Sequence, residues 1–212
     1  MYRLLVIIIR FFFYLTNGKP KVTGLEHLDP KEPVIIAGTH RSLLDPFFVA
    51  IAVYPHPVAF MAKDSLFKFK PLAWLLKQGY VFPVNRDKPS ASTIKHAVSV
   101  MNDHQQWLGI FPSGTRHSTE IKSGTAFIQK LSKRDIIPVA IQPPKSTLHF
   151  FLRQKAKLAF GTPIAFQVDA KYDKERLAQI DQQLASQFDE LDQQLDPNYH
   201  YVPKSKKASN EN

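Results

Sequence analysis

Five short apolar runs, separated by stretches with helical periodicity, constrain the fold of this chain more than any other feature. Each run is continuously apolar, whereas a strand with one face in water alternates apolar and polar residues. Strands covered on both faces belong to sheets with helices on each side, and helices between successive strands favour parallel pairing. The sequence therefore predicts an α/β fold with a largely parallel, mixed sheet flanked by helices. The runs occupy residues 34–38, 58–62, 80–84, 109–112 and 136–141.

The chain has 212 residues, of which 44% are apolar, so it is long enough for one such domain with short appendages. We expect an anchoring helix over residues 1–18 and the α/β domain over residues 19–170. Large apolar residues recur every three or four positions between 174 and 195. This spacing predicts an amphipathic helix that packs on the domain within residues 171–200. The last residues, 201–212, are typical of a disordered basic tail.

The first fifteen residues are apolar apart from Arg3 and Arg10. As a helix this segment is about 22 Å long, which is shorter than the roughly 30 Å hydrocarbon core of a bilayer. The two arginines are seven positions apart, so they share one helical face while apolar residues cover the rest. This pattern favours a helix lying in the membrane interface. A buried core helix, a tilted short span and a signal peptide stay open, although Thr16–Pro20 makes a poor cleavage site.

Charge is distributed unevenly along the chain. The 28 basic and 18 acidic side chains give a net charge of +10. Residues 1–170 have a net charge of +12, and residues 171–197 have a net charge of −4. A basic body attracts anionic lipid, phosphorylated substrates, nucleic acid or an acidic partner. We expect no nucleic acid partner, because the apolar N-terminal helix has no role in a nucleic-acid-binding protein.

The chain contains no cysteine. This excludes a disulfide scaffold, a thiol nucleophile, an iron–sulfur cluster and a thiolate zinc site. No His-x-x-x-His pair and no carboxylate cluster stands at metal-ligand spacing, so we expect no metal.

His40 and Asp45 follow the first apolar run, at the kind of position where catalytic groups gather in open α/β sheets. Because they are five positions apart, they meet only if the chain between them turns. Asp45 then accepts a hydrogen bond from one imidazole nitrogen and leaves the other free as a general base. Two alternatives stay open. Asp45 before Pro46 also suits the N-cap of a helix, and His40 also suits a hydrogen-bonded core position.

Three cations follow three of the other predicted strands: Lys63, Arg86 and Arg116. Each alone is explained as well by a solvated surface charge. Together, in a basic α/β domain, they predict a phosphate pocket.

A turn with the sequence Ser113-Gly114-Thr115 follows the fourth apolar run. Such a turn presents backbone N–H groups, which serve either an oxyanion or a phosphate. A nucleophilic Ser113 is a further alternative, but the flanking glycines of a nucleophile elbow are missing.

These stretches, in this order, resemble the PlsC-like family of glycerolipid acyltransferases, the 1-acyl-sn-glycerol-3-phosphate acyltransferases. The segment Ala62–Phe67 also resembles a stretch of that family whose lysine helps to bind the acceptor phosphate. The resemblance spans about residues 22–165. The four blocks that carry it are His40-x4-Asp45, Gly79 through Arg86, Phe111-Pro-Ser-Gly-Thr-Arg116 and Ile137-Pro-Val-Ala140.

The resemblance implies a glycerol-3-phosphate acyltransferase-like fold, with the acyltransferase activity in the central domain. It implies transfer of a fatty acyl group from acyl-CoA or acyl-ACP (acyl carrier protein) to the sn-2 hydroxyl of lysophosphatidic acid, with no other cofactor. His40 would be the base and Asp45 would fix its tautomer, while Lys63, Arg86 and Arg116 would hold the acceptor phosphate. Such an enzyme is expected on the cytoplasmic face of the cell membrane, as a peripheral or monotopic protein.

Ser113 stands where this family usually has Glu, which removes a carboxylate from the acceptor side of the site. A related enzyme with a different lysolipid acceptor therefore stays open. A non-catalytic protein that binds anionic lipid through its basic face and N-terminal helix also stays open, and His40→Ala would leave its function unchanged.

Overall fold

Seven strands form one sheet in the computed structural model, which describes residues 1–29, 31–85 and 90–203. The strand order is β1-β7-β6-β2-β5-β3-β4. Every neighbouring pair is parallel except β6 and β7, which are antiparallel. The predicted largely parallel, mixed sheet is thus confirmed. The strands are β1 (Lys21–Thr23), β2 (Ile35–Gly38), β3 (Val58–Lys63), β4 (Val81–Val84), β5 (Trp107–Ile110), β6 (Ile136–Gln142) and β7 (Lys157–Phe160).

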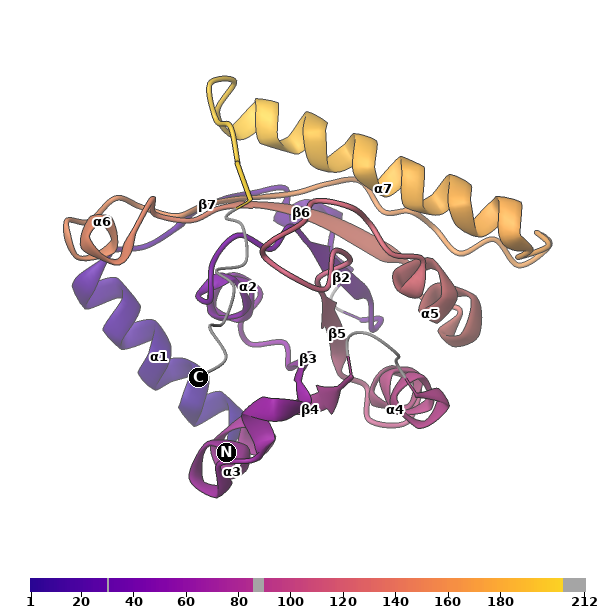
Figure 1. Ribbon diagram of the computed structural model, residues 1–212, viewed down its shortest axis with the longest axis horizontal. Coiled ribbons are helices and arrows are strands. Elements are labelled where there is room, and N and C mark those ends of the chain that lie inside the picture. The colour runs from indigo at the N-terminus through magenta and orange to yellow at the C-terminus, as the bar shows by residue number, and fades with distance from the viewer. Residues whose placement is uncertain (30, 86–89, 204–212) are drawn as a thin grey trace, which may run out of the picture.

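Helices cover both faces of this sheet (Figure 1). Side chains of α4, α5 and α7 pack on one face, and side chains of α1, α2 and α6 pack on the other. The helices are α1 (Tyr2–Thr16), α2 (Asp45–Ala52), α3 (Lys70–Gln78), α4 (Ala91–Asn102), α5 (Gly124–Ser132), α6 (Thr147–Phe151) and α7 (Lys174–Leu195), with short 3₁₀ helices η1 (Leu25–His27) and η2 (Asp64–Phe67).

Strand β2 lies at the centre of the sheet, between β5 and β6. Ile35 and Ala37 face the layer of α4, α5 and α7, whereas Ile36 faces the layer of α1, α2 and α6. All four residues of β2 are buried. A strand covered on both faces has no polar side, which explains the continuous apolar run in its sequence.

Several boundaries differ from the predicted ones. The run over 109–112 starts earlier, at Trp107, and ends at Ile110; Pro112 has no N–H for a sheet hydrogen bond. Between the second and third runs, the chain forms η2 and then α3, which begins only at Lys70. The short strands β1 and β7 and the helices α5 and α6 were not predicted.

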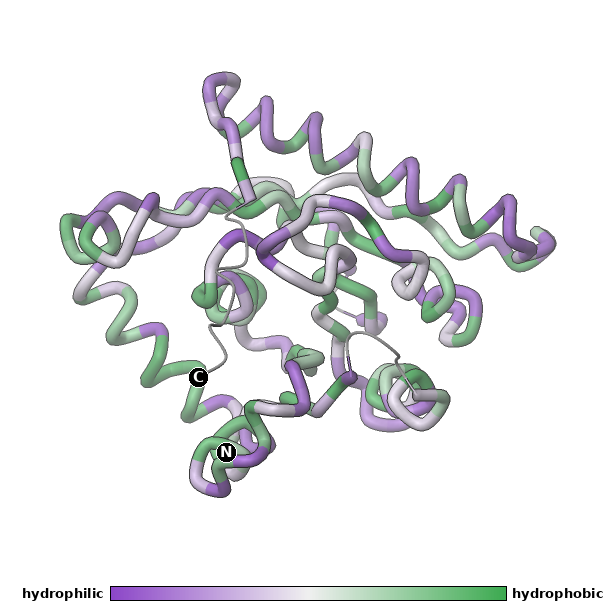
Figure 2. Tube along the Cα trace, viewed as in Figure 1, coloured by the Kyte–Doolittle hydropathy of each residue, from purple (hydrophilic) through white to green (hydrophobic). Residues whose placement is uncertain are grey.

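Helix α1 packs on the body by one side only. Tyr2 and Val6 are buried, and the ring of Phe13 packs edge-on against Phe48 and Phe150, with ring centroids 5.2 and 5.3 Å away. Figure 2 shows that most of this helix is apolar, with hydrophilic positions between the apolar ones. Within the described part of the chain, no helix has both the length and the apolar content of a membrane span. The exposed apolar residues of α1 are Leu4, Ile7, Ile8, Phe11, Phe12 and Leu15.

The end of α1 is fixed to the body by Asn17, whose side chain is fully buried. Its amide Nδ2 donates hydrogen bonds of 2.8 Å to the carbonyl oxygens of Phe150 and Gln154. These two carbonyls belong to α6 and to the loop that follows it. The N-terminal helix is therefore joined rigidly to the domain at its C-terminal end.

The helix predicted between residues 174 and 195 is α7. Its apolar stripe includes Ile180, Leu184 and Phe188, which pack in the core on the face of the sheet shared with α4 and α5. Asp173 caps its first turn by accepting a hydrogen bond from the backbone N–H of Arg176.

Gly109 on β5 has no room for a side chain, because a Cβ there would lie 2.1 Å from the ring of Phe60. We expect Gly109→Ala to lower the free energy of unfolding by about 1–3 kcal/mol, since the ring must move within a packed core. Urea unfolding followed by circular dichroism measures this change.

The matched control is Gly124→Ala, where nothing lies within 4 Å of the added Cβ. Gly124 opens α5, and alanine is favoured in helices, so stability should hold or rise slightly. Equal unfolding midpoints for the two variants would contradict the packing argument.

Candidate active site

Asp45 organises the loop between β2 and α2. Its side chain is fully buried, and Oδ2 accepts hydrogen bonds from the backbone N–H groups of Arg41 and Ser42, both at 2.6 Å. The same oxygen lies 3.0 Å from Nδ1 of His40. The alternative in which Asp45 caps α2 is wrong, because Leu44 is the N-cap and Asp45 is the first helical residue. The carboxylate instead folds the preceding loop around itself.

The contact with Asp45 determines which nitrogen of His40 carries the proton. An ionised carboxylate only accepts hydrogen bonds, so Nδ1–H of the imidazole is the donor. In the neutral ring, Nε2 then keeps its lone pair. The pair thus has the arrangement of a general base with its orienting carboxylate.

The ring of His40 is also held from its face. It stacks on Phe111 with a centroid distance of 4.3 Å and an interplanar angle of 22°. Phe111 in turn lies nearly parallel to Phe60, 6.1 Å away. Because Phe111 follows β5 and His40 follows β2, the structure brings the first and third predicted motifs together.

The loop after Phe111 turns sharply at Gly114, whose φ of +66° lies in the left-handed region. The hydroxyl of Ser113 donates to the carbonyl oxygen of Thr115 at 2.8 Å. Ser113 therefore stabilises its own turn. Within the described residues it has no hydrogen bond to His40, and this geometry is not that of a serine nucleophile activated by a base.

Two cavities meet at His40. One has a volume of about 220 Å³ and is lined by residues that include Arg41, Ser113 and Tyr201. The other has a volume of about 110 Å³, and Phe111 and Lys122 are among its lining residues. His40 lines both. Two groups bound in the two cavities would therefore both lie beside the imidazole.

Of the predicted phosphate-binding cations, the two that the structure describes line neither of the cavities beside His40. Lys63 is the exposed last residue of β3, and Arg116 is half-buried. Arg86 lies outside the described residues. Of the described cations, those that line the two cavities are Arg41 and Lys122. The sequence prediction did not include these two residues.

Arg41 makes a partly buried ion pair with Asp192 of α7, 151 positions further along the chain. Burial alone would lower the pKa of the guanidinium, but its hydrogen bonds to Asp192 and the nearby negative charges raise that pKa overall. The rings of Tyr199 and Tyr201 lie 5.0 and 5.4 Å from the guanidinium carbon. The C-terminal segment is thus part of the site.

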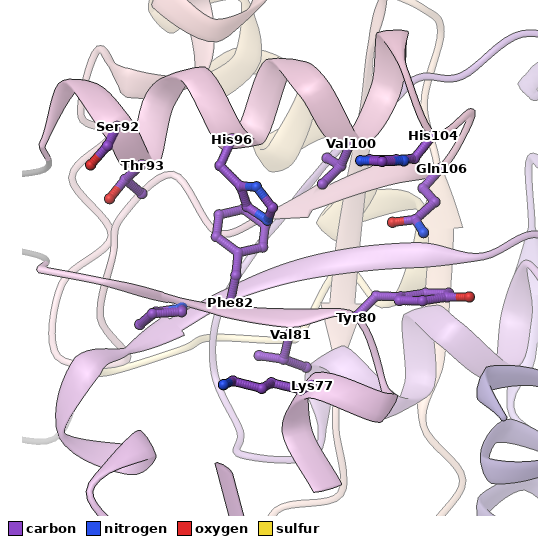
Figure 3. A pocket seen from close by; sticks show the side chains of 11 residues that line it. Lys77, Tyr80, Val81, Phe82, Ser92, Thr93, His96, Val100, His104 and Gln106 are labelled. Atoms are coloured by element: carbon purple, nitrogen blue, oxygen red, sulfur yellow. The ribbon is translucent and has the colours of Figure 1, made fainter. Parts of the chain in front are cut away.

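A larger cavity of about 630 Å³ lies at the edge strand β4, between α3 and α4 (Figure 3). There the ring of His96 meets Phe82 edge-on, with centroids 4.6 Å apart. His40 is not among the residues that line it. This cavity is therefore separate from the pair of His40 and Asp45. Among the described residues, no cluster of three or more His, Cys, Asp or Glu side chains is placed to hold a metal ion.

Comparison with known proteins identifies the family of this chain. The model of the acyltransferase family matches residues 19–142, which include His40, Asp45 and the loop over 111–116. The chain belongs to the acyltransferase family. The resemblance to its PlsC-like members, predicted from the four blocks, is confirmed.

Two bacterial relatives of this acyltransferase are named 1-acyl-sn-glycerol-3-phosphate acyltransferase. The protein from Bacillus subtilis is 34% identical over 85% of this chain and 92% of its own length. The protein from Streptococcus pneumoniae is 33% identical over 77% of this chain, and the match spans 62% of its own length.

A solved structure shares the fold. The 1-acyl-sn-glycerophosphate (LPA) acyltransferase PlsC from Thermotoga maritima superposes with a TM-score of 0.67, covering 93% of this chain and 82% of that one. At 17% sequence identity, this likeness supports the architecture of the sheet and helices.

Asp45→Asn tests the role of the buried carboxylate. The amide keeps the shape but removes the charge that three N–H donors point at, and it buries an NH₂ group where Oδ1 has no hydrogen-bond partner among the described residues. We expect a loss of about 1–3 kcal/mol in unfolding free energy. Chemical denaturation of this variant and of the exposed control Asp103→Asn measures the difference; equal losses would contradict the assignment.

Proposed function

We propose that this protein is a 1-acyl-sn-glycerol-3-phosphate acyltransferase, which transfers a fatty acyl group from a thioester to the sn-2 hydroxyl of lysophosphatidic acid. The product is phosphatidic acid, a precursor of phospholipids. The observation that carries the proposal is the His40–Asp45 pair beside two cavities, in which Nε2 has no hydrogen bond to any of the described residues. The names of the bacterial relatives support the choice of acceptor.

The reaction needs a base at the acceptor hydroxyl. Nε2 of His40 takes the proton as the hydroxyl oxygen attacks the thioester carbonyl, and Asp45 stabilises the imidazolium that forms. The tetrahedral intermediate then collapses. The C–S bond breaks, and the thiolate leaves with the proton from the imidazolium, so that the ester and a free thiol are the products.

The proposed reaction proceeds without a covalent enzyme intermediate. The chain has no cysteine, and the hydroxyl of Ser113 is engaged with Thr115. The backbone N–H groups around Ser113, Gly114 and Thr115 serve either the oxyanion or the acceptor phosphate. Direct transfer between a bound thioester and a bound acceptor agrees with a base that borders two cavities.

The acceptor phosphate is the group that orients the hydroxyl. In our proposal Lys63 and Arg116 hold it, because Lys63 ends β3 and Arg116 follows β5, and both strands run parallel to β2, after which His40 lies. Arg86 would belong to the same set. Lys122, which lines the smaller cavity, is a further cation within reach of the site.

The acyl donor is acyl-ACP or acyl-CoA. Both are anionic and suit the net charge of +12 on residues 1–170. Both are also cytoplasmic, so we place the enzyme on the cytoplasmic face of the cell membrane, where α1 lies in the interface as a peripheral or monotopic anchor. Its exposed apolar side supports this position.

His40→Ala tests the reaction. Purified protein is added to liposomes containing lysophosphatidic acid and offered each thioester, and phosphatidic acid is measured by mass spectrometry. We expect product from the wild type and a loss of about 10²–10⁴-fold in rate for the variant. His149→Ala, which changes an exposed histidine on α6, is the matched control.

The remaining arms of this experiment separate the alternatives. Arg116→Ala should raise KM for the acceptor more than it lowers kcat, because it removes a phosphate ligand. No product with either donor would overturn the proposal as stated. Product only from a lysolipid with a substituted phosphate would identify a different acceptor, as the change from Glu to Ser113 allows. Liposome binding that survives in a protein with no activity would indicate a non-catalytic lipid-binding role.

The double substitution Phe11→Ser, Phe12→Ser tests the membrane contact. Both rings are exposed on α1, at 64% and 57% of their surface. We expect binding to anionic liposomes in a flotation assay to fall by at least about tenfold, since two apolar side chains lose their burial in the interface. Phe127→Ser, at an exposed phenylalanine of α5, should leave binding unchanged. Equal binding by all three proteins would exclude α1 as the anchor.

A further inference from the structure

We propose that Asp192 and Tyr201, which lie outside the matched family region, are positioning residues that hold the two active-site loops in register. The inference rests on the proposed acyl transfer and adds a role for the C-terminal segment. The two loops are residues 39–44, which carry the base, and residues 111–116, which carry the turn at Gly114. We refer to them as the base loop and the turn loop.

The base loop is attached to α7 through one side chain. Nη1 of Arg41 donates to Oδ1 of Asp192 at 2.7 Å and to the carbonyl of Ile141 at 2.8 Å, and Nη2 donates to Oδ2 of Asp192. The backbone N–H of the same Arg41 donates to Asp45. Side chain and backbone of one residue therefore connect Asp192 to the carboxylate that orients His40.

Low exposure and further hydrogen bonds restrict the movement of the Arg41–Asp192 ion pair. The Arg41 side chain is 8% exposed and that of Asp192 is 17% exposed. Gln142 holds Asp192 in turn, since its Nε2 donates to the backbone carbonyl of Asp192 at 3.0 Å and to Oδ1 at 3.2 Å. A guanidinium this buried needs a neutralising partner. Without the charge of Asp192, we expect the Arg41 side chain to turn toward solvent, which would shift the backbone of the base loop.

The turn loop is attached to the same segment by Tyr201. Its hydroxyl donates to the carbonyl oxygen of Arg116 at 2.6 Å. Its ring lies over the guanidinium of Arg41, on which Tyr199 also packs. Tyr201 thus contacts both loops at once, and Asp192 and Tyr201 line the cavity of about 220 Å³ beside His40.

These contacts differ from those that attach α7 to the domain. The helix is anchored by its apolar stripe, which includes Ile180, Leu184 and Phe188. Asp192 is not part of that stripe. A change at Asp192 should therefore leave the helix in place and alter the base loop.

The first test compares Asp192→Asn with Glu190→Gln, which removes the charge of an exposed carboxylate two positions earlier on α7. Each is assayed for kcat and KM with lysophosphatidic acid in liposomes. We expect Asp192→Asn to lower kcat by about 10- to 100-fold, because small displacements of a catalytic base have effects of this size. Glu190→Gln should retain wild-type kcat. Asp192→Glu should restore part of the rate, since it restores the charge.

Hydrogen–deuterium exchange, read by mass spectrometry on peptides covering residues 39–44, provides a readout that needs no activity. In Asp192→Asn the amides of Arg41 and Ser42 should exchange faster, while peptides from β2 and α7 keep wild-type protection. Wild-type exchange and wild-type kcat in Asp192→Asn would overturn the inference. So would an exchange increase spread over the whole domain, which would indicate a merely structural role.

Tyr201→Phe tests the second attachment and keeps the ring on Arg41. We expect KM for the acceptor to rise about three- to tenfold, the effect of one hydrogen bond, with little change in melting temperature. An unchanged KM would remove Tyr201 from the proposal. A wild type inactive on every acceptor would refute the proposed function instead, while the exchange experiment would still decide whether Asp192 positions the base loop.

Discussion

The site depends on one buried charge. The carboxylate of Asp45 has no exposed surface, and the groups that compensate it are the ring N–H of His40 and the backbone N–H groups of Arg41 and Ser42. A carboxylate removed from water is costly unless such donors surround it. The loop between β2 and α2 is therefore restricted to conformations that bring three consecutive residues to one oxygen. The orientation of His40 therefore follows from the hydrogen bonds that the buried carboxylate of Asp45 requires.

Support for the base comes from three separate parts of the chain. The stack of His40, Phe111 and Phe60 links it to β5 and β3, and the absence of a side chain at Gly109 makes room for Phe60. On the other side, Arg41 links the same loop to α7. In the proposed reaction the family motif supplies the reacting groups, while packing and an ion pair from outside the motif hold these groups in position.

The contact between His40 and Asp45 could be predicted from the sequence, because the two residues are close in the chain and follow a strand with a continuous apolar run. Strands β1 and β7 could not be predicted in this way, because each begins with a lysine and is followed or preceded by polar residues, so neither contains a long continuous apolar run. The contact between Arg41 and Asp192 spans 151 positions, and no local pattern records such a pairing. One hint existed: the net charge of −4 on residues 171–197 opposes a basic body, and Asp192 directly follows Leu191 of the apolar stripe.

Asn17 has a consequence for how the molecule would sit on a surface. Because its side-chain amide donates hydrogen bonds to two carbonyl oxygens of the domain, α1 is a rigid attachment and not a flexible tether. A flexible tether lets a domain sample many distances and tilt angles relative to the plane in which its anchor lies. A rigid attachment defines one distance between the domain and that plane, and one orientation of the domain. The depth at which a lipid carries its hydroxyl would then become a criterion of recognition, set by the geometry of the scaffold and independent of the residues that contact the headgroup.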